Sequence, residues 1–214
     1  MVPTSPKFSW FVVDSETWGV APTQLCQGYT MTQTNELSID VRVMEADEFA
    51  AMRAVAVAAF ADESIGALLD QLRQSWSWRD ELAFVAVRND EIVAQVLYSY
   101  ATLDAPHALV DVLVLSPVGV RPDLQLQGIG SHLIRQSLIA VERRADPLVF
   151  LEGSPLYYPR FGFTPGGERG FIKPSQRIPD PAFMVRTNDE SGIDLSGTLV
   201  YPDVFWRTDS VGLR

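Results

Sequence analysis

One stretch of this sequence constrains the fold more than any other, because it joins an apolar run, a glycine-containing turn and the start of a helix. Residues 113–120, Leu-Val-Leu-Ser-Pro-Val-Gly-Val, are typical of a buried strand, and a short polar connection follows them. The next segment begins near Gly128 and carries apolar residues at helical spacing, at Ile129, Leu133, Ile134, Leu138 and Val141. The sequence therefore predicts a strand, a short loop and a helix in direct succession.

The start of the predicted helix has the properties of an anion site. The N–H groups of a first helical turn have no partner within the helix, and the helix dipole adds partial positive charge there. Gly128 and Gly130 lack a Cβ, so a pyrophosphate can approach the backbone closely. No Lys-Ser/Thr pair follows these glycines, which excludes a Walker-type phosphate loop. The pattern Gln-x-x-Gly-x-Gly is weak alone, and the strand before it strengthens the interpretation.

A proline interrupts the predicted strand at position 117. Proline cannot donate to a sheet ladder, so we expect a bulge or a splay at which this strand leaves its neighbour. Backbone groups around Val118 and Val120 would then be available to pair with an extended ligand that contains amides. Coenzyme A has this shape, because its pantetheine arm carries two amides and ends in a pyrophosphate.

Two motifs resemble those of the GNAT superfamily of acyl-CoA-dependent N-acetyltransferases. The first spans residues 120–130 as Val-x4-Gln-x-x-Gly-x-Gly. The second, Tyr-Pro-Arg-Phe-Gly-Phe at residues 158–163, resembles the Tyr-x-x-x-Gly-Phe that follows the fifth strand in this family. Residues 153–163 and 181–185 also resemble small bacterial acetyltransferases of the YhbS type. The resemblance extends from about residue 39 to the C-terminus and is specific for fold and cofactor, but not for the acceptor.

The resemblance implies that acetyl-CoA is the cosubstrate. The residues expected to bind it lie at the end of the strand and the start of the helix, and they are Val118, Gly119, Val120, Gln125, Leu126, Gln127, Gly128, Ile129, Gly130 and Ser131. The fold that the resemblance implies is α+β, with a mixed, mostly antiparallel central sheet, flanking helices and a splay between the fourth and fifth strands.

Acetyl transfer from a thioester to an amine requires a neutral amine, a donor for the tetrahedral oxyanion and a proton for the leaving thiolate. Tyr158 matches the family tyrosine whose phenol is implied to protonate the departing sulfur or to hydrogen-bond with it. The alternative is a core aromatic residue, and we expect its neighbour Tyr157 to be one.

The general base is harder to identify from the sequence. Histone-acetylating members of the family resemble one another in a glutamate on the fourth strand, but the corresponding residue here is Val114, which cannot accept a proton. Asp111, Glu152 and an ordered water remain as candidates. We prefer Glu152 because it ends the predicted strand at residues 148–151 and faces the splay; the alternative is a solvated carboxylate at a strand end.

Composition limits the classes of partner. A formal charge of −10 argues against nucleic acid and mildly favours a cationic acceptor, either a small-molecule or a peptide amine. One cysteine and two histidines, Cys26, His107 and His132, argue against a metal site. No apolar run has the length of a transmembrane helix and no signal peptide is evident, so we expect a cytoplasmic protein without a membrane partner. A homodimer is compatible with the sequence.

The remaining chain is organised around this central unit. We expect residues 1–36 to form an extension that is poorly packed, an extra strand or a partner-binding arm, and residues 37–214 to form a single N-acetyltransferase domain. Asp47 is the expected N-cap of a helix that ends near Phe60. Residues 156–161 are expected to form a short helix, and a strand is expected to begin at residues 162–163.

Two functions from different classes agree with these features. The first is an acetyl-CoA-dependent N-acetyltransferase that moves an acetyl group to a primary amine by direct attack. The second is a module of the same fold that binds acyl-CoA or a protein partner without catalysis. Val114 in place of a carboxylate keeps the second alternative open, whereas the glycines of the loop and Tyr158 favour the enzyme.

Overall fold

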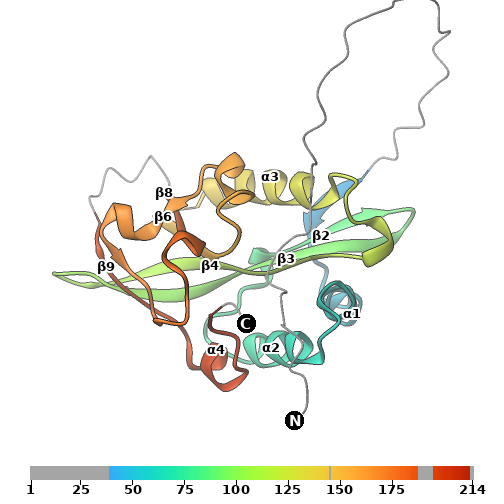
Figure 1. Cartoon of the computed structure of the whole chain (residues 1–214). Helices are drawn as coiled ribbons and strands as arrows, with labels where there is room; N and C mark the ends of the chain where they lie inside the picture. The colour runs from blue at the N-terminus through green and yellow to red at the C-terminus, as the bar shows by residue number, and fades with distance from the viewer. Residues whose placement is uncertain (1–38, 145, 188–194, 213–214) are drawn as a thin grey trace, which may run out of the picture.

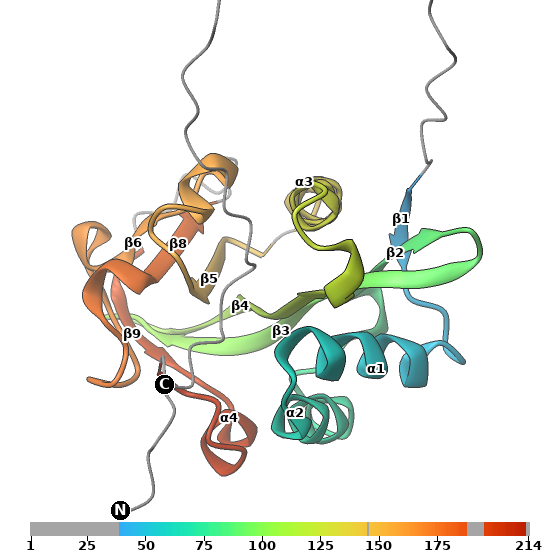
Figure 2. The same cartoon turned by 45° about the vertical axis from the view of Figure 1, so that its right-hand side comes forward.

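The structure is a computed structural model that describes residues 39–144, 146–187 and 195–212. The predicted extension at residues 1–36 lies outside the described residues. Within the described chain, nine strands form one sheet, and helices cover both of its faces (Figure 1). Helix α3 lies on one face, and α1, α2 and α4 lie on the other, as the turned view in Figure 2 also shows.

The strand, loop and helix predicted around residues 113–141 are present in the structure. The strands are β1 (Asp40–Val43), β2 (Ala83–Arg88), β3 (Glu91–Asp104), β4 (Leu109–Val120), β5 (Leu148–Glu152), β6 (Thr164–Pro165), β7 (Phe171–Ile172), β8 (Phe183–Thr187) and β9 (Gly197–Val200). The helices are α1 (Phe49–Phe60), α2 (Glu63–Arg73), α3 (Ile129–Glu142) and α4 (Asp203–Arg207). Strand order along the sheet is β1-β2-β3-β4-β5-β8-β6, and β9 pairs with both β3 and β7.

Most neighbouring strands are antiparallel, and β4 with β5 is a parallel pair. This pair is held only at Leu113↔Val149 and Val114↔Phe150, although β4 continues to residue 120 and β5 to residue 152. The two strands therefore separate beyond Val114. The α+β fold and the splay between the fourth and fifth strands are confirmed.

A β-bulge accounts for the proline in the middle of β4. Val96 of β3 faces Val118, whereas Tyr98 faces Leu115, so one residue of β3 is opposite both Ser116 and Pro117. The Ser116–Pro117 peptide bond is cis. A bulge tolerates proline because the extra residue makes no ladder hydrogen bond. The bulge lies at the level where β4 leaves β5.

Two hydrophobic clusters fill the two sides of the sheet. On the α1, α2 and α4 side, the helices pack on inward residues of the strands, among them Leu97, Val114 and Phe150. On the α3 side, the helix packs on the alternate residues, which include Leu115 and Leu151. The alternation of side chains along each strand thus assigns every residue near the splay to one face of the sheet.

Three local predictions were wrong in detail. The N-cap of α1 is Glu48 and not Asp47, and its side chain does not cap the helix but binds the guanidinium of Arg42, with N–O distances of 2.6 and 2.7 Å. The Glu48 side chain thus forms an ion pair with Arg42 of β1 instead of capping the helix. The short helix is a 3₁₀ turn at residues 158–161, and the following strand begins at Thr164 because Gly162 first turns the chain through a left-handed conformation (φ +84°).

Candidate active site

The end of β4 forms one side of the splay. The side chains of Val118 and Val120 are buried in the cluster on the α3 side. Gly119 faces the other side, where a Cβ added to it would lie 2.9 Å from the Cβ of Ala59 in α1. The close approach of α1 thus explains the glycine at position 119. The segment predicted to pair with an extended ligand is therefore closely packed on both faces of the sheet.

The loop after β4 is fastened back onto the strand. The side-chain amide of Gln125 donates to the carbonyl oxygen of Val120 over 3.1 Å, which holds the turn closed. Leu126 adopts φ +63° and is 58% exposed, and Gln127 donates to the carbonyl oxygen of Asp123 over 3.5 Å. Gln125 of the motif therefore shapes the loop that directs the chain into α3.

Helix α3 begins with the predicted glycine. Gly128 is the N-cap, with φ +80°, and apart from its chain neighbours no atom of the described residues lies within 4 Å of a Cβ added there. Ile129, Gly130 and Ser131 form the first turn and are buried on the side of the sheet. The hydroxyl of Ser131 hydrogen-bonds with that of Tyr157 over 3.1 Å. The helix start thus has open space outside its backbone, and packed side chains beneath it.

Tyr158 lies in the 3₁₀ helix η3 (Tyr158–Phe161) and is 2% exposed. Its ring makes edge contacts with Tyr157 and Phe163, at centroid distances of 5.1 and 5.9 Å. Its ring also lies close against the backbone just after β5, because a Cβ added to Gly153 would come within 2.2 Å of the ring. Burial raises the pKa of the Tyr158 phenol well above its usual range, so the hydroxyl keeps its proton at neutral pH.

Glu152 ends β5 and is not the solvated carboxylate that was the alternative. Its Oε2 accepts the backbone N–H of Gly212 over 2.9 Å, and the carboxylate also hydrogen-bonds with the phenol of Tyr201. Burial raises the pKa of Glu152 to about 7, although the bonds from Tyr201 and Gly212 and the charge of Arg177 partly oppose this rise. A carboxyl group with this pKa is about half ionised at neutral pH.

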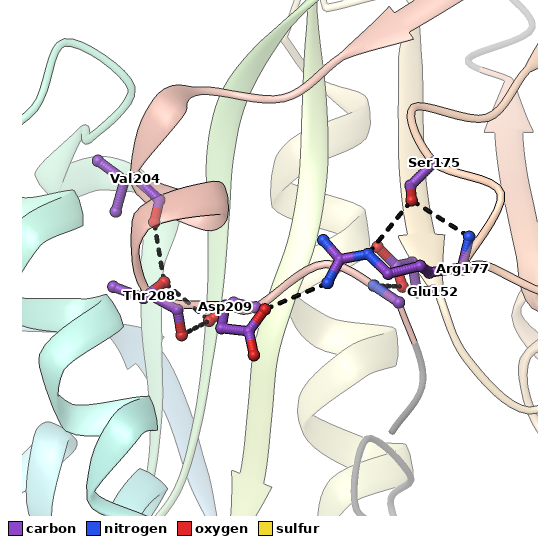
Figure 3. A network of polar contacts seen from close by, with 8 residues as sticks. Glu152, Ser175, Arg177, Val204, Thr208 and Asp209 are labelled. Carbon is purple, nitrogen blue, oxygen red and sulfur yellow. Dashed lines mark hydrogen bonds and ion pairs between the residues drawn. The ribbon is translucent and has the colours of Figure 1, made fainter.

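A polar network holds the segment after α4 against Glu152 (Figure 3). Arg177 donates to Asp209 over 3.1 Å and to the hydroxyl of Ser175 over 3.4 Å. Thr208 donates to the carbonyl oxygen of Val204 over 2.8 Å, which closes the end of the helix. These contacts fix the chain that carries the Gly212 N–H.

A small cavity of about 20 Å³ lies next to the Glu152 carboxylate. The residues that line it are Val114, Ser116, Glu152, Tyr201, Phe205 and Ser210. Ser116 belongs to the bulge of β4, so the cavity adjoins the splay. Its volume suffices for one water-sized group.

The two predicted catalytic residues lie on opposite faces of the sheet. Tyr158 belongs to the cluster on the α3 side, together with Leu151. Glu152 follows Leu151, so its side chain points to the other face, where its cavity neighbours Val114 and Phe205 also lie. The structure thus places the two side chains on opposite faces of the sheet.

The other carboxylate considered as a general base lies elsewhere. Asp111 is exposed, pairs with Thr102 and does not line the cavity. Sequence reasoning missed Tyr201 and Gly212, which approach Glu152 from the C-terminal part of the chain and carry no motif.

In the part of the chain that the structure describes, no three His, Cys, Asp or Glu side chains are grouped so as to hold a metal ion. No helix there is long and apolar enough to cross a membrane.

Comparison with known proteins agrees with this architecture. The family model for the acetyltransferase (GNAT) domain matches residues 40–166, more than half of the chain. The chain belongs to the GNAT family. It is 30% identical over 124 residues to the uncharacterized N-acetyltransferase YjhQ of Escherichia coli (strain K12), a match that covers 58% of this chain and 68% of YjhQ.

Two solved GNAT structures share the fold. One is YhbS from Escherichia coli in complex with CoA, with a TM-score of 0.73, 20% identity and coverage of 83% of this chain and 97% of that chain. The other is a GNAT acetyltransferase from Brucella melitensis in complex with acetyl-CoA, with a TM-score of 0.63, 24% identity and coverage of 79% and 99%. The family match includes the loop before α3 and Tyr158, but it ends before Tyr201 and the segment that covers Glu152.

Proposed function

We propose that this GNAT protein is an acetyl-CoA-dependent N-acetyltransferase that moves an acetyl group to a primary amine by direct attack. The observation that carries the proposal is the arrangement around the splay, with Tyr158 on one face of the sheet and Glu152 on the other. A thioester held between β4 and β5 would have a base on the side from which an amine arrives and a proton donor on the other side.

The residues present fit acetyl-CoA. Beyond Val114, the edge of β4 that faces β5 has no ladder partner among the described residues, so its backbone is available to the pantetheine amides. Gly128 leaves open space at the N-terminus of α3, where the pyrophosphate would be bound by first-turn N–H groups. Solved GNAT relatives contain CoA or acetyl-CoA, which supports the same assignment here. When bound, acetyl-CoA supplies the thioester that is the acetyl donor.

Glu152 serves as the general base in this proposal. Its pKa of about 7 lies near the working pH, where a carboxylate can both accept a proton and remain substantially ionised. Glu152 takes the proton that the amine nitrogen loses, and Tyr158 donates its phenolic proton to the departing sulfur. One proton is lost by nitrogen and one is gained by sulfur, so the transfer needs no further reactant, and exchange with solvent restores both side chains.

The main alternative is a non-catalytic acyl-CoA-binding or protein-interaction module of the same fold. The observation that favours it is the apolar Val114 where histone-acetylating GNAT proteins are expected to have a glutamate. The cytoplasmic location, the homodimer and the exclusion of nucleic acid stay predictions.

The decisive experiment measures thiol release from acetyl-CoA with a panel of primary amines, in parallel with CoA binding by calorimetry. We expect thiol release that depends on an amine and falls sharply in Glu152→Gln, while CoA binding in this variant is retained. CoA binding without turnover of any amine would favour the module instead.

A further inference from the structure

The size and the lining of the cavity beside Glu152 also indicate which class of amine it can accept. We propose that it receives the amino group of the acceptor and selects unbranched amines, in which the nitrogen is on a CH2 group, over amines with a branch at that carbon. This inference rests on the proposed function and names the acceptor class for the same site.

The lining suits an ammonium or amine head group. Glu152 is the only charged residue among the six that line the cavity. Two donors occupy part of its carboxylate, the Tyr201 phenol and the Gly212 N–H, whereas an ionised carboxylate has about four lone-pair sites. The remaining sites can accept from the nitrogen of an amine, and the hydroxyls of Ser116 and Ser210 add further acceptors.

The size of the cavity limits the substituents that the nitrogen can carry. About 20 Å³ holds one water-sized group, which an amino group matches. Each additional carbon next to the nitrogen must find room at the mouth. A single CH2 can lead straight out of the cavity, whereas a second substituent on this carbon would press sideways into the wall.

The walls cannot give way easily. Val114 and Phe205 are each 1% exposed and belong to the core on the side of α1 and α2. Ser116 is fixed in the bulge of β4. Gly212, whose N–H holds the Glu152 carboxylate, is itself closely packed, because a Cβ added to it would come within 2.6 Å of Arg177. Overfilling such a site requires displacement of packed groups, which is costly.

The cavity also lies where an attacking nitrogen is needed. Ser116 lines it and is followed directly by Pro117 and Val118, the segment expected to contact the thioester. An amino group beside Ser116 therefore adjoins both the proposed base and the acetyl-binding segment. The Tyr201 ring stacks on Phe205, with centroids 5.0 Å apart, and both residues line the cavity.

The test compares 1-aminobutane with 2-aminobutane, two isomers of equal charge that differ only in the branch. Thiol release from acetyl-CoA should give a kcat/KM for 1-aminobutane at least about 10-fold higher, since one carbon in a tight pocket changes this ratio by roughly 10–200-fold. Val114→Ala removes two carbons from the cavity wall and should bring the ratio of the two kcat/KM values close to one.

Val112→Ala is the matched control, because Val112 lies on the same strand and face and is fully buried but does not line the cavity. It should leave the isomer ratio unchanged, with folding of both variants checked by thermal melts. Equal kcat/KM values for the two isomers in the wild-type protein would overturn the inference.

Binding provides a second measurement, independent of turnover. In the presence of CoA, 1-aminobutane should raise the melting temperature more than 2-aminobutane, and Val114→Ala should remove this difference. If neither amine is acetylated but the binding difference persists, the enzymatic proposal fails and the amine site stands. If neither isomer binds or reacts, or both bind equally, the inference itself is wrong.

Discussion

Replacement of Tyr201 by phenylalanine should move the pH dependence of the reaction. The phenol of Tyr201 hydrogen-bonds with the carboxylate of Glu152 and thereby lowers its pKa, against the larger effect of burial. Tyr201→Phe keeps the ring that stacks on Phe205 but removes this donor. The Gly212 N–H then remains on Oε2, so the carboxylate should stay in place with a higher proton affinity.

The direction and size of the shift follow from these contacts. A base must be deprotonated to act, so kcat/KM of the wild-type protein should rise with pH through the Glu152 pKa of about 7. A hydrogen bond to a charged group contributes roughly 1.5–3 kcal/mol, and one pKa unit corresponds to about 1.4 kcal/mol. Relaxation and solvent entry reduce the effect, and we expect the acid limb to move upward by about one pH unit.

The assay is the pH profile of kcat/KM for thiol release between pH 5.5 and 9, at about 0.1 M salt to fix the screening. Tyr98→Phe is the matched control, because it removes a buried hydroxyl that bonds to Ser137 over 2.8 Å, away from Glu152. Its profile should keep the wild-type midpoint even if the protein is less stable. An acid limb in Tyr201→Phe that stays at the wild-type midpoint, or moves to lower pH, would refute the role of Tyr201 and the assignment of Glu152 as base.

Three further predictions concern the proposed CoA loop, the proposed proton donor Tyr158 and the buried carboxylate of Glu152. CoA at about 100-fold above its Kd should stabilise the fold by about 2.7 kcal/mol, which thermal melts would record as a rise in melting temperature. Gly128→Glu should abolish this rise. The control variant Gly170→Glu, at a glycine with nearly the same φ (+79°), should retain it. Tyr158→Phe should lower kcat by about 100-fold or more, whereas Tyr157→Phe, which removes the hydroxyl that bonds to Ser131, should change it little; equal effects would leave Tyr158 as a core aromatic. The pKa of Glu152 rises from 4.5 to about 7 on folding, so its contribution to the free energy of unfolding should fall by at most about 3 kcal/mol between pH 4.5 and 7. Chemical denaturation of Glu152→Gln should lack this decrease with pH.

The sequence predicted the local structure around the proposed CoA loop far better than the surroundings of Glu152. The strand, the interruption at Pro117, the loop and the helix start at Gly128 are contiguous, so local rules for proline, glycine and helical spacing suffice to place them. Even there, Gly119 was assigned to the cofactor, whereas the approach of Ala59 from α1 gives it a packing role that only the structure reveals.

The surroundings of Glu152 follow no local rule. Gly212 is 60 residues away in the sequence, and Tyr201 directly follows β9, the strand that pairs with β3 and β7. Neither residue belongs to a spaced motif, and the burial that raises the pKa of Glu152 is a property of the assembled sheet and of the segment that covers it. From sequence alone, Glu152 was as consistent with a solvated strand end as with a base.

The position of Glu152 also bears on the choice between an enzyme and a binding module. The parallel pairs Leu113↔Val149 and Val114↔Phe150, extended by two residues, would place Glu152 opposite Ser116. Val114 and Glu152 line the same cavity from the two sides of the splay. A carboxylate on β5 can therefore reach the place that a carboxylate on β4 would occupy, so the apolar residue at position 114 does not deprive the site of a base. Maintaining a carboxyl group in this cavity costs folding stability at neutral pH, and strongly perturbed pKa values gather at functional sites. A module that only held CoA at the α3 side would gain nothing from that cost, whereas an acetyltransferase needs a proton acceptor there.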